Sequence, residues 1–383
     1  MDIARRLAAP GRDWDTDPEG EVRLAVVGLG NYARSVSIPA IEAAEYCAFT
    51  VGVSGTPATR EAVAEDHGVE TIDYEAYADG AASGAYDAVY VATPNRLHLP
   101  HAETAADLGK DVICEKPLEA TVERAERLVE ACEAAGVTLM TAYRMQADPV
   151  VRALRRAIAD GALGTVTRAT GGFTFDVLGG TRGPDQWRLD EDLAGGGALM
   201  DVGVYPLNTT RYLLDADPVA VRGQIRSTPP FDAVDEHVDF EVEFPACVGQ
   251  FNASFSGQSD ARLAVYGTEG IVELRRAFQP RADRRVIVET DDGRAVLEGR
   301  GADETREEFA YFGHCLLTDR HPEPDGRLPP ADDGHDGLLS RGLQPVVGTT
   351  TWSGSTPCGC WATKSSPRWP GRPSPGARPT RRS

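Results

Sequence analysis

Short apolar runs and amphipathic stretches alternate along the first 142 residues. Apolar runs bounded by turn residues predict buried strands, and the stretches between them, with apolar positions three or four residues apart, predict helices. The predicted strands cover 21–27, 48–54, 88–92, 111–115 and 138–142, and the predicted helices cover 34–44, 57–67, 99–108 and 122–135. This alternation indicates a parallel sheet covered by helices on both faces.

The pattern changes after Tyr143. Helices are predicted at 149–159, 197–214 and 304–317, but most of this half consists of strand-like runs with alternating apolar and polar positions, separated by turn residues such as Asp292-Gly293. The predicted strands cover 166–175, 219–226, 239–244, 248–255, 261–266, 271–274 and 285–290. Such runs are typical of antiparallel strands.

The charge balance is unusual. The 383 residues include 39 Lys and Arg against 59 Asp and Glu, a formal net charge of −20, with 41% hydrophobic residues to form a core. Before residue 341 the net charge is −27, and the only lysines there are Lys110 and Lys116. Because so acidic a surface repels itself at low salt, the sequence favours a salt-adapted protein over an ordinary acidic one. Nucleic acid and anionic membranes are disfavoured as partners, since phosphate needs clustered cations.

Targeting and metal-binding signals are also missing from the sequence. No apolar run approaches the roughly 20 residues that cross a bilayer, and the charged first residues lack the apolar region of a signal peptide, so a cytoplasmic location is predicted. The seven cysteines fit neither a disulfide framework nor a zinc site. His98 and His101 form H-x-x-H without a third ligand at suitable spacing, so no metal is expected.

The C-terminal end differs from the rest of the chain. Residues 341–383 contain seven basic residues, seven prolines and no acid, with no helical or strand period. Residues 329–383 are therefore assigned to an atypical tail. It is either a disordered segment or the product of a shifted reading frame, because Arg, Pro, Trp and Cys enrichment is what out-of-frame GC-rich DNA encodes.

The first predicted strand ends in a turn with the pattern G-x-G-x-x-A, which includes Asn31 and Tyr32. Gly28 permits a tight turn, Gly30 lets the backbone approach a pyrophosphate, and Ala33 allows the next helix to pack on the sheet with its N-terminus toward the phosphates. The position between a strand and a helix predicts a dinucleotide site. The alternative is a glycine-rich connection in an unliganded sheet of the same kind.

These elements predict an α/β protein with an N-terminal Rossmann domain and a C-terminal α+β domain containing a largely antiparallel open sheet. The predicted divisions are an arm at 1–20, the dinucleotide-binding domain at 21–142, a substrate-binding and oligomerisation domain at 143–328, and the tail. Because a sheet with one face free of helices normally needs a cover, a homo-oligomer, a dimer or a tetramer, is predicted.

The end of the second strand favours NADP over NAD. An acidic residue there would hold the ribose 2′-hydroxyl and repel a 2′-phosphate. The sequence has Ser54, Thr56 and, one turn into the next helix, Arg60, with no carboxylate before Glu61. These side chains offer hydrogen bonds and a positive charge to the phosphate. The alternative is that Arg60 is a solvated charge on a helix.

Two further motifs follow strands of the parallel sheet, T-P-N at 93–95 and E-K-P at 115–117. Open α/β sheets bind ligands beyond the carboxyl ends of their strands. The predicted cofactor contacts in this region are Thr93, Pro94, Asn95, His98, Glu115 and Lys116. His98 either lines the nicotinamide site or caps the following helix.

A third motif, G-G-G-x-L-x-D-x-G-x-Y, occupies residues 195–205. Asp201 and Tyr205 are four residues apart and Asn208 follows three later, so one helix face presents a carboxyl, a phenol and an amide.

Together the E-K-P and G-G-G-x-L-x-D-x-G-x-Y motifs resemble the family of glucose–fructose oxidoreductase and inositol dehydrogenase, over roughly residues 22–320. The resemblance implies catalytic roles for Lys116 and Asp201. Many members have His where this chain has Tyr205, and tyrosine there resembles the glucose–fructose oxidoreductase, dihydrodiol dehydrogenase and xylose dehydrogenase branch. Residues 142–145 and 185–190 add a likeness to the NADP-dependent D-xylose dehydrogenases of salt-loving archaea. The tail departs from the amphipathic segment with which the family ends.

The chemistry of these residue types agrees with the resemblance. Oxidising a sugar hydroxyl requires a base, and an ordinary tyrosine has a pKa near 10, too high for neutral pH. We assign Tyr205 as the general acid/base, Lys116 as the cation that lowers its pKa and binds the reacting oxygen, and Asp201 as the group that orients the sugar or Lys116. The alternatives are a surface charge for Lys116, a structural partner for Asp201 and a core aromatic for Tyr205.

The predicted function is NADP-dependent oxidation of an aldose, with D-xylose favoured, at C1 to the lactone. The predicted substrate contacts are Arg144, Trp187, Arg188, Asp201, Tyr205 and Asn208. Core or surface roles remain the alternatives for Trp187 and Arg188. The alternative functions are another sugar or polyol oxidoreductase of the same family, such as a glucose–fructose oxidoreductase, and a non-catalytic NADP-binding regulatory protein.

Overall fold

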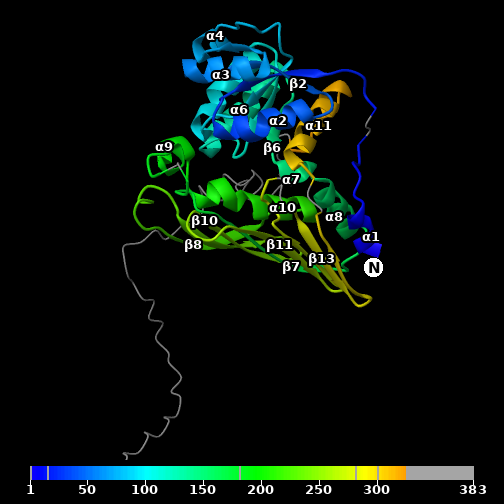
Figure 1. Cartoon of the computed structure of the whole chain (residues 1–383). Helices are drawn as coiled ribbons and strands as arrows, with labels where there is room; N and C mark the ends of the chain where they lie inside the picture. The colour runs from blue at the N-terminus through cyan, green and yellow to red at the C-terminus, as the bar shows by residue number, and fades with distance from the viewer. Residues whose placement is uncertain (1, 15–16, 181–182, 281–282, 300–301, 325–383) are drawn as a thin grey trace, which may run out of the picture. The chain divides into compact units, whose positions relative to one another are not determined.

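The computed structural model describes residues 2–14, 17–180, 183–280, 283–299 and 302–324, which form two sheets with helices packed on them (Figure 1). The predicted tail at 329–383, with both its interpretations, lies outside the described residues, as does the end of the predicted second domain at 325–328. The predicted fold class, a parallel sheet followed by a largely antiparallel one, is confirmed.

The N-terminal half forms a six-stranded parallel sheet with the order β3-β2-β1-β4-β5-β6. Its strands are β1 (Val22–Val27), β2 (Cys47–Val53), β3 (Glu70–Ile72), β4 (Ala88–Val91), β5 (Asp111–Glu115) and β6 (Leu139–Ala142). The helices are α2 (Ile38–Ala43), α3 (Pro57–His67), α4 (Tyr74–Ala78), α5 (His98–Asp107) and α6 (Val122–Ala135), with the π turn η1 (Ala33–Ser37) before α2 and the 3₁₀ turn η2 (Asn95–Leu97) before α5.

Strand β1 shows how this sheet is covered on both sides. Leu24 and Val26 belong to the apolar cluster that includes α2, whereas Ala25 and Val27 belong to the cluster that includes α5 and α6. The strand order reverses between β1 and β4. Dinucleotides bind in the crevice beyond the carboxyl ends of the strands at such a reversal.

The second half forms an eight-stranded sheet with the order β14-β13-β12-β11-β7-β10-β9-β8. Its strands are β7 (Val166–Thr174), β8 (Ala220–Arg226), β9 (His237–Glu243), β10 (Val248–Ser254), β11 (Asp260–Gly267), β12 (Gly270–Arg275), β13 (Arg285–Thr290) and β14 (Gly293–Leu297). All neighbours are antiparallel except β7 and β10, which are parallel. Sequence analysis did not predict β14, an edge strand whose residues are exposed or half-buried and so lack a clear apolar alternation.

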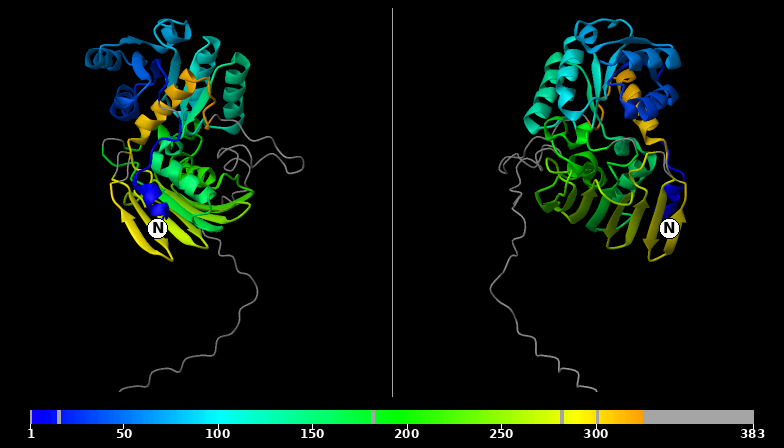
Figure 2. Two further views of the ribbon diagram at one scale, coloured as in Figure 1. Left: turned by 90° about the vertical axis from the view of Figure 1, so that its right-hand side faces the viewer. Right: turned by 60° about the vertical axis from the view of Figure 1, so that its left-hand side comes forward.

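Helices cover one face of this sheet. They are α7 (Arg144–Ala147), α8 (Pro149–Ala159), α9 (Glu191–Ala194) and α10 (Val204–Leu214), with the 3₁₀ turn η3 (Trp187–Leu189) and the π turn η4 (Leu199–Gly203). Figure 2 shows α8 and α10 lying along the sheet, and no helix of the described residues on the opposite face.

Two helices cross between the halves of the chain. The predicted arm contains α1 (Asp2–Ala8), which sequence analysis missed, and its Ile3 and Leu7 are buried in the core of the second sheet. Helix α11 (Glu304–Leu317) has the predicted bounds, but Phe309 and Phe312 pack in the core of the first sheet with Leu24. The predicted division at 143–328 therefore separates α11 from the core that it completes.

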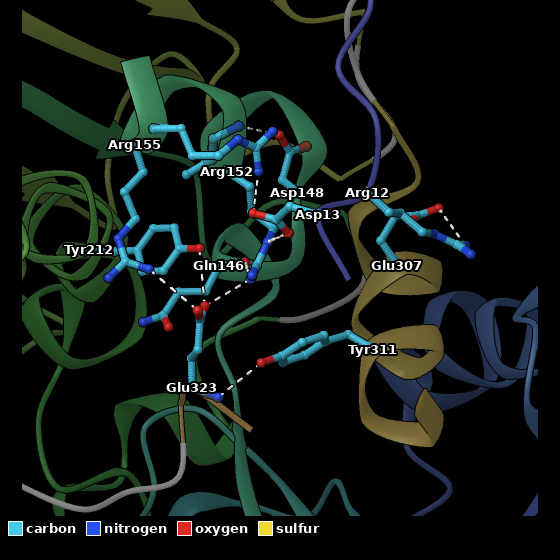
Figure 3. A network of polar contacts seen from close by, with 12 residues as sticks. Arg12, Asp13, Gln146, Asp148, Arg152, Arg155, Tyr212, Glu307, Tyr311 and Glu323 are labelled. Carbon is cyan, nitrogen blue, oxygen red and sulfur yellow. Dashed lines mark hydrogen bonds and ion pairs between the residues drawn. The ribbon is translucent and has the colours of Figure 1, made fainter. Parts of the chain in front are cut away.

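Ion pairs around Arg152 hold both ends of the described chain against α8 (Figure 3). The Arg152 guanidinium donates to Asp13 at 2.5 Å and to Glu323 at 2.9 Å. It also donates to the backbone carbonyl of Gln146 at 2.9 Å and lies 5.1 Å from the ring centroid of Tyr311. Because Asp13 precedes β1 and Glu323 follows α11, one buried cation fixes both ends beside α7 and α8.

Candidate active site

The glycine turn after β1 has the geometry that a pyrophosphate needs. Gly28 has φ +103°, and a Cβ there would lie 2.7 Å from the carbonyl oxygen of Ala92, so only glycine fits between β1 and the end of β4. A Cβ on Gly30 would meet nothing within 4 Å, so the backbone faces open space. Ala33 is buried against the sheet. The turn therefore fits a dinucleotide.

The three side chains predicted to favour NADP gather at the end of β2. The guanidinium of Arg60 donates to the backbone carbonyl of Ser54 at 2.6 Å, and the Thr56 amide donates to the Ser54 hydroxyl at 3.3 Å. Arg60 therefore turns back toward the strand end instead of extending from its helix. A Cβ on Gly55 would lie 3.3 Å from the ring of Tyr74, a wall of this corner that sequence analysis missed because Tyr74 comes from a later helix.

His98 lies between two backbone segments, and its predicted contact with the cofactor stays a prediction. Its side chain is fully buried, with Nε2 2.9 Å from the carbonyl oxygen of Thr93 and Nδ1 3.2 Å from that of Leu118. Burial lowers the pKa of His98, and the two carbonyl oxygens act in the opposite direction. His98 thus joins the two loops that follow β4 and β5.

Asn95 connects the loop after β4 to the second half of the chain. Its buried amide donates to the carbonyl oxygen of Ala194 at 2.8 Å, at the end of α9. The T-P-N loop, with Thr93 and Pro94, is thereby attached to the start of the glycine motif at 195–197. Direct contacts of these three residues with a cofactor stay predictions.

Lys116 and Asp201 form an ion pair beyond the carboxyl end of β5. The Lys116 ammonium donates to Oδ1 of Asp201 at 3.0 Å and to the Asp201 backbone carbonyl at 2.8 Å. Burial opposes the charge on Lys116, but Asp201 and the electrostatic influence of Tyr205 outweigh it and raise the pKa of the ammonium. An ammonium has three donors, and the third N–H of Lys116 has no acceptor among the described residues. It is free for a substrate oxygen.

The glycine motif brings Asp201 to Lys116. Gly195 has φ +75°, and a Cβ there would lie 2.1 Å from the carbonyl oxygen of Ala120, which follows the E-K-P motif. A Cβ on Gly197 would lie 2.0 Å from the carbonyl oxygen of Asp235. The Asp235 carboxylate accepts from the Gly197 amide at 2.6 Å and from the next turn of backbone, at the start of η4. The glycines are required because backbone meets backbone, at Gly195 between the two halves of the chain and at Gly197 within the second half.

Tyr205 lies on α10 with its ring held by aromatic neighbours. The ring is 5.4 Å from Phe173 in an edge contact and 5.7 Å from Phe278, centroid to centroid. Two cations lie near it: the Lys116 ammonium at 5.1 Å and the Arg144 guanidinium at 4.6 Å from the ring centroid. The Tyr205 hydroxyl makes no hydrogen bond to any described residue, so it too is free for a substrate.

The electrostatics of Tyr205 differ from the prediction. Burial raises the pKa of the Tyr205 phenol, and this effect exceeds the lowering by Arg144 and Lys116. Glu115 and Asp201 add to the increase. Lys116 acts to lower the pKa of Tyr205, as predicted, and so does Arg144, but removal of the phenol from water has the larger effect and the net shift is upward.

Arg144 is also not placed as a substrate contact. It is buried, donates to Glu304 at 2.8 Å and to the backbone carbonyl of Phe278 at 2.6 Å, and reaches the site only through the ring of Tyr205. Sequence analysis missed Glu304 because 160 residues separate the partners. No local signal marks such a pair.

The other predicted substrate residues divide into two groups. Arg188 donates to Oδ2 of Asp201 at 3.0 Å, and its guanidinium lies 4.6 Å from the ring centroid of Trp187, so both stand beside the ion pair. Asn208 is buried and accepts from Gln146 at 2.9 Å. It supports α7 instead of lying beside Lys116.

Glu115 and Tyr32 lie on the sheet side of the site. The Glu115 carboxylate accepts from the Tyr90 hydroxyl at 2.7 Å and from the Lys116 amide at 3.2 Å. Burial, reinforced by Glu115, raises the pKa of Tyr32 well above its ordinary value. The Glu115 carboxylate is thus hydrogen-bonded within the protein, and the contacts of both side chains with a cofactor stay predictions.

The first domain is a Rossmann domain with an open glycine turn, and the second domain brings a phenol to the ion-paired lysine beyond the ends of the Rossmann strands. This combination defines the class of nicotinamide-dependent oxidoreductases. Within the described ranges no helix is long and apolar enough to cross a membrane. The same ranges gather no three His, Cys, Asp or Glu side chains that could hold a metal ion.

Similarity to known proteins identifies the family within this class. Residues 22–143 match an oxidoreductase family with an NAD-binding Rossmann fold, and residues 151–273 match the GFO/IDH/MocA C-terminal domain. The D-xylose 1-dehydrogenase (NADP(+)) of Haloarcula marismortui is 46% identical over 324 residues, covering 82% of this chain and 89% of that protein. D-xylose 1-dehydrogenase (NADP(+)) 2 of Haloferax volcanii is 33% identical over 79% of this chain and 90% of that protein.

A solved structure agrees with these matches. The aldose–aldose oxidoreductase from Caulobacter crescentus, complexed with glycerol, is similar with a TM-score of 0.76 and 31% identity over 86% of this chain and 95% of that one. The chain belongs to the GFO/IDH/MocA family of oxidoreductases, which confirms the resemblance found in the sequence.

Proposed function

We propose that this chain is an NADP-dependent aldose dehydrogenase that oxidises D-xylose at C1 to the lactone. The observation that carries the proposal is the Lys116–Asp201 ion pair beside the free hydroxyl of Tyr205, at the carboxyl end of β5. The similarity to D-xylose 1-dehydrogenases of two salt-loving archaea supports the choice of D-xylose.

In this proposal Tyr205 takes the proton from the C1 hydroxyl. The third N–H of Lys116 donates to the same oxygen and stabilises the negative charge that develops as the proton leaves. Asp201 keeps Lys116 charged and directed at that oxygen, since it occupies the other two N–H groups. NADP, when bound, supplies the nicotinamide that accepts the hydride from C1.

The cofactor is held by two regions. The open backbone at Gly30 and the start of the following helix face the pyrophosphate. Ser54, Thr56 and Arg60 receive the 2′-phosphate, and the absence of a carboxylate before Glu61 leaves this corner without repulsion for it. Trp187 and Arg188 form the wall of the sugar site next to Asp201.

The surroundings of the enzyme are part of the proposal. The net charge of −20 with almost no lysine suits a cytoplasm of high salt concentration. The helix-free face of the second sheet is proposed as the surface that joins subunits into a dimer or tetramer. Light scattering in molar salt tests the assembly, and a monomer at working concentration would reject it.

The function is tested by reduction of NADP with a panel of free aldoses in molar KCl. D-xylose is expected to have the highest kcat/KM. Lys116→Ala should lower kcat severely while NADP affinity is nearly unchanged, and Tyr205→Phe should lower kcat about 10²- to 10⁴-fold, as for a positioned acid/base.

Each unexpected result has a distinct meaning. A higher kcat/KM for a hexose or a polyol would place the chain among other sugar oxidoreductases of the family. Binding of NADP without turnover of any sugar would identify a regulatory protein. Near-normal turnover of Tyr205→Phe would transfer the role of base to Lys116.

A further inference from the structure

Arg144 lies over one face of the ring of the proposed base, Tyr205. Its guanidinium carbon is 4.6 Å from the ring centroid, closer than the Lys116 ammonium at 5.1 Å. Its side chain is only 4% exposed, so its contacts lie within the protein. Arg144 therefore faces the ring of Tyr205 from within the core.

A buried cluster of four charges holds Arg144 in this place. Arg144 pairs with Glu304 at 2.8 Å, and Arg284 pairs with Asp148 at 2.5 Å. All four side chains are at most 4% exposed. Arg144 lies on α7 and Glu304 on α11, while Asp148 precedes α8 and Arg284 precedes β13. The cluster therefore connects α11, which packs in the core of the first sheet, to the elements of the second sheet.

The guanidinium of Arg144 has one buried donor without a partner. The guanidinium donates to Glu304 and to the carbonyl oxygen of Phe278, but its buried Nε has no acceptor among the described residues. Glu304 is its ion-pair partner and Glu308, also on α11, acts on it electrostatically, yet in a buried region of low dielectric the guanidinium still exerts a field on groups within a few ångströms. The nearest group that can gain negative charge during the reaction is the Tyr205 phenol.

Other charged and titratable groups face Tyr205 from the elements around it. Lys116 and Glu115 come from the end of β5, Asp201 from η4, Tyr143 from the start of α7 and Tyr32 from the glycine turn. Lys116 is largely committed to Asp201. Arg144 is thus the nearest cation to the ring whose counter-ion, Glu304, lies away from the substrate side.

We propose that Arg144 is a positioning residue that stabilises the Tyr205 phenolate through the ring, and that Glu304 sets the strength of this effect by partly neutralising it. The inference rests on the proposed role of Tyr205 as general base. It replaces the predicted role of Arg144 as a substrate contact, and it explains how a buried phenol can lose its proton in a site where Lys116 is already paired.

The test is the pH dependence of kcat/KM for the sugar in Arg144 and Glu304 variants of the full chain. In the pH profile, the limb assigned to Tyr205 is the rise in kcat/KM as the phenol loses its proton. Arg144→Met should move this limb by about one pH unit toward alkaline values, which lowers the rate about tenfold at neutral pH. KM for the sugar should be nearly unchanged, and the rate should recover at high pH. Glu304→Gln should move the same limb in the opposite direction, and Arg144→Lys should keep it near its original position.

Folding is controlled with two further variants. Arg144→Met together with Glu304→Gln removes both members of the pair, so no unpaired charge stays buried, and should give a smaller alkaline shift than Arg144→Met alone. Arg284→Met disturbs the same buried cluster without approaching the ring of Tyr205, and should leave the limb in place.

The outcomes separate this inference from the proposed function. If Tyr205→Phe retains normal turnover, the assigned base is wrong and the inference falls with it. If Tyr205→Phe is inactive while Arg144→Met and Glu304→Gln leave the limb unmoved or move it in the same direction, only the role of Arg144 is rejected. A raised KM in Arg144→Met with an unmoved limb would restore Arg144 as a substrate contact. In the Tyr205→Phe background, Arg144→Met should cause no further loss of kcat.

Discussion

Replacing Asp201 with asparagine tests the ion pair on which the proposed chemistry depends. Asparagine keeps the shape of the side chain but removes the charge that faces Lys116 at 3.0 Å and Arg188 at 3.0 Å. The backbone carbonyl of residue 201 still accepts one hydrogen bond from Lys116. The substitution therefore changes the electrostatics of the site more than its structure.

The size of the effect follows from distance and burial. At an effective dielectric constant of about 20, two charges 3.0 Å apart attract each other by about 5 kcal/mol. Burial of the ammonium opposes this attraction, and the side chains of Lys116 and Asp201 are 11% and 17% exposed, which weakens the pair further. We expect a loss of about 2 kcal/mol in the free energy of unfolding and about 10² in kcat, since Lys116 loses the negative charge that supports its own.

The pH dependence of stability gives a second measure of the same pair. Lys116 and Arg188 hold the pKa of Asp201 below its ordinary value. The contribution of the carboxylate is therefore complete above the pKa of the unfolded chain, about 4, and is lost as the pH falls toward the folded pKa. The difference in stability between wild type and Asp201→Asn should be constant above about pH 5 and should shrink below pH 4.

Denaturant unfolding at several pH values and steady-state kinetics in molar KCl measure both effects. Asp87→Asn is the matched control, because Asp87 pairs with Arg23 at an exposed site and should contribute less than about 1 kcal/mol and nothing to turnover. Normal kcat in Asp201→Asn would show that the carboxylate only supports η4. An undiminished stability difference at pH 3 would show that the ion pair is not its source.

The remaining predictions concern the cofactor, the glycine motif and the Arg152 network. Ser54→Asp should shift the ratio of kcat/KM for NADP and NAD toward NAD, because a negative charge would face the 2′-phosphate; an unchanged ratio would mean that this strand end is not the phosphate site. Gly197→Ala should abolish most activity and lower the melting temperature, because its Cβ would lie 2.0 Å from the carbonyl oxygen of Asp235; an active, equally stable variant would contradict the close approach. Arg152→Met should destabilise the fold by about 2 kcal/mol in denaturant unfolding, since Asp13 and Glu323 lose their shared buried partner while keeping Arg156 and Arg155; an unchanged stability would show that Arg152 is dispensable.

The sequence by itself determined the order of the elements and the chemistry of the site. Hydrophobic periodicity located most strands of both sheets and the whole of α11, because each has a buried face. The motifs located Gly28, because the tight turn requires glycine. They also located Lys116 and Asp201, because the reaction requires a cation and a group that orients it. Elements without a buried apolar pattern, such as β14, and the short helix α1 were missed.

Only the tertiary structure decided which residues serve the site directly and which support it. His98 and Arg144 look in sequence like ligands, yet one joins two loops and the other lies behind Tyr205 with Glu304. Their roles depend on burial and on partners far away in the chain, and neither is encoded in local spacing. The pKa of Tyr205 is raised for the same reason, because removal from water is a property of the packed core and outweighs the cations beside the ring.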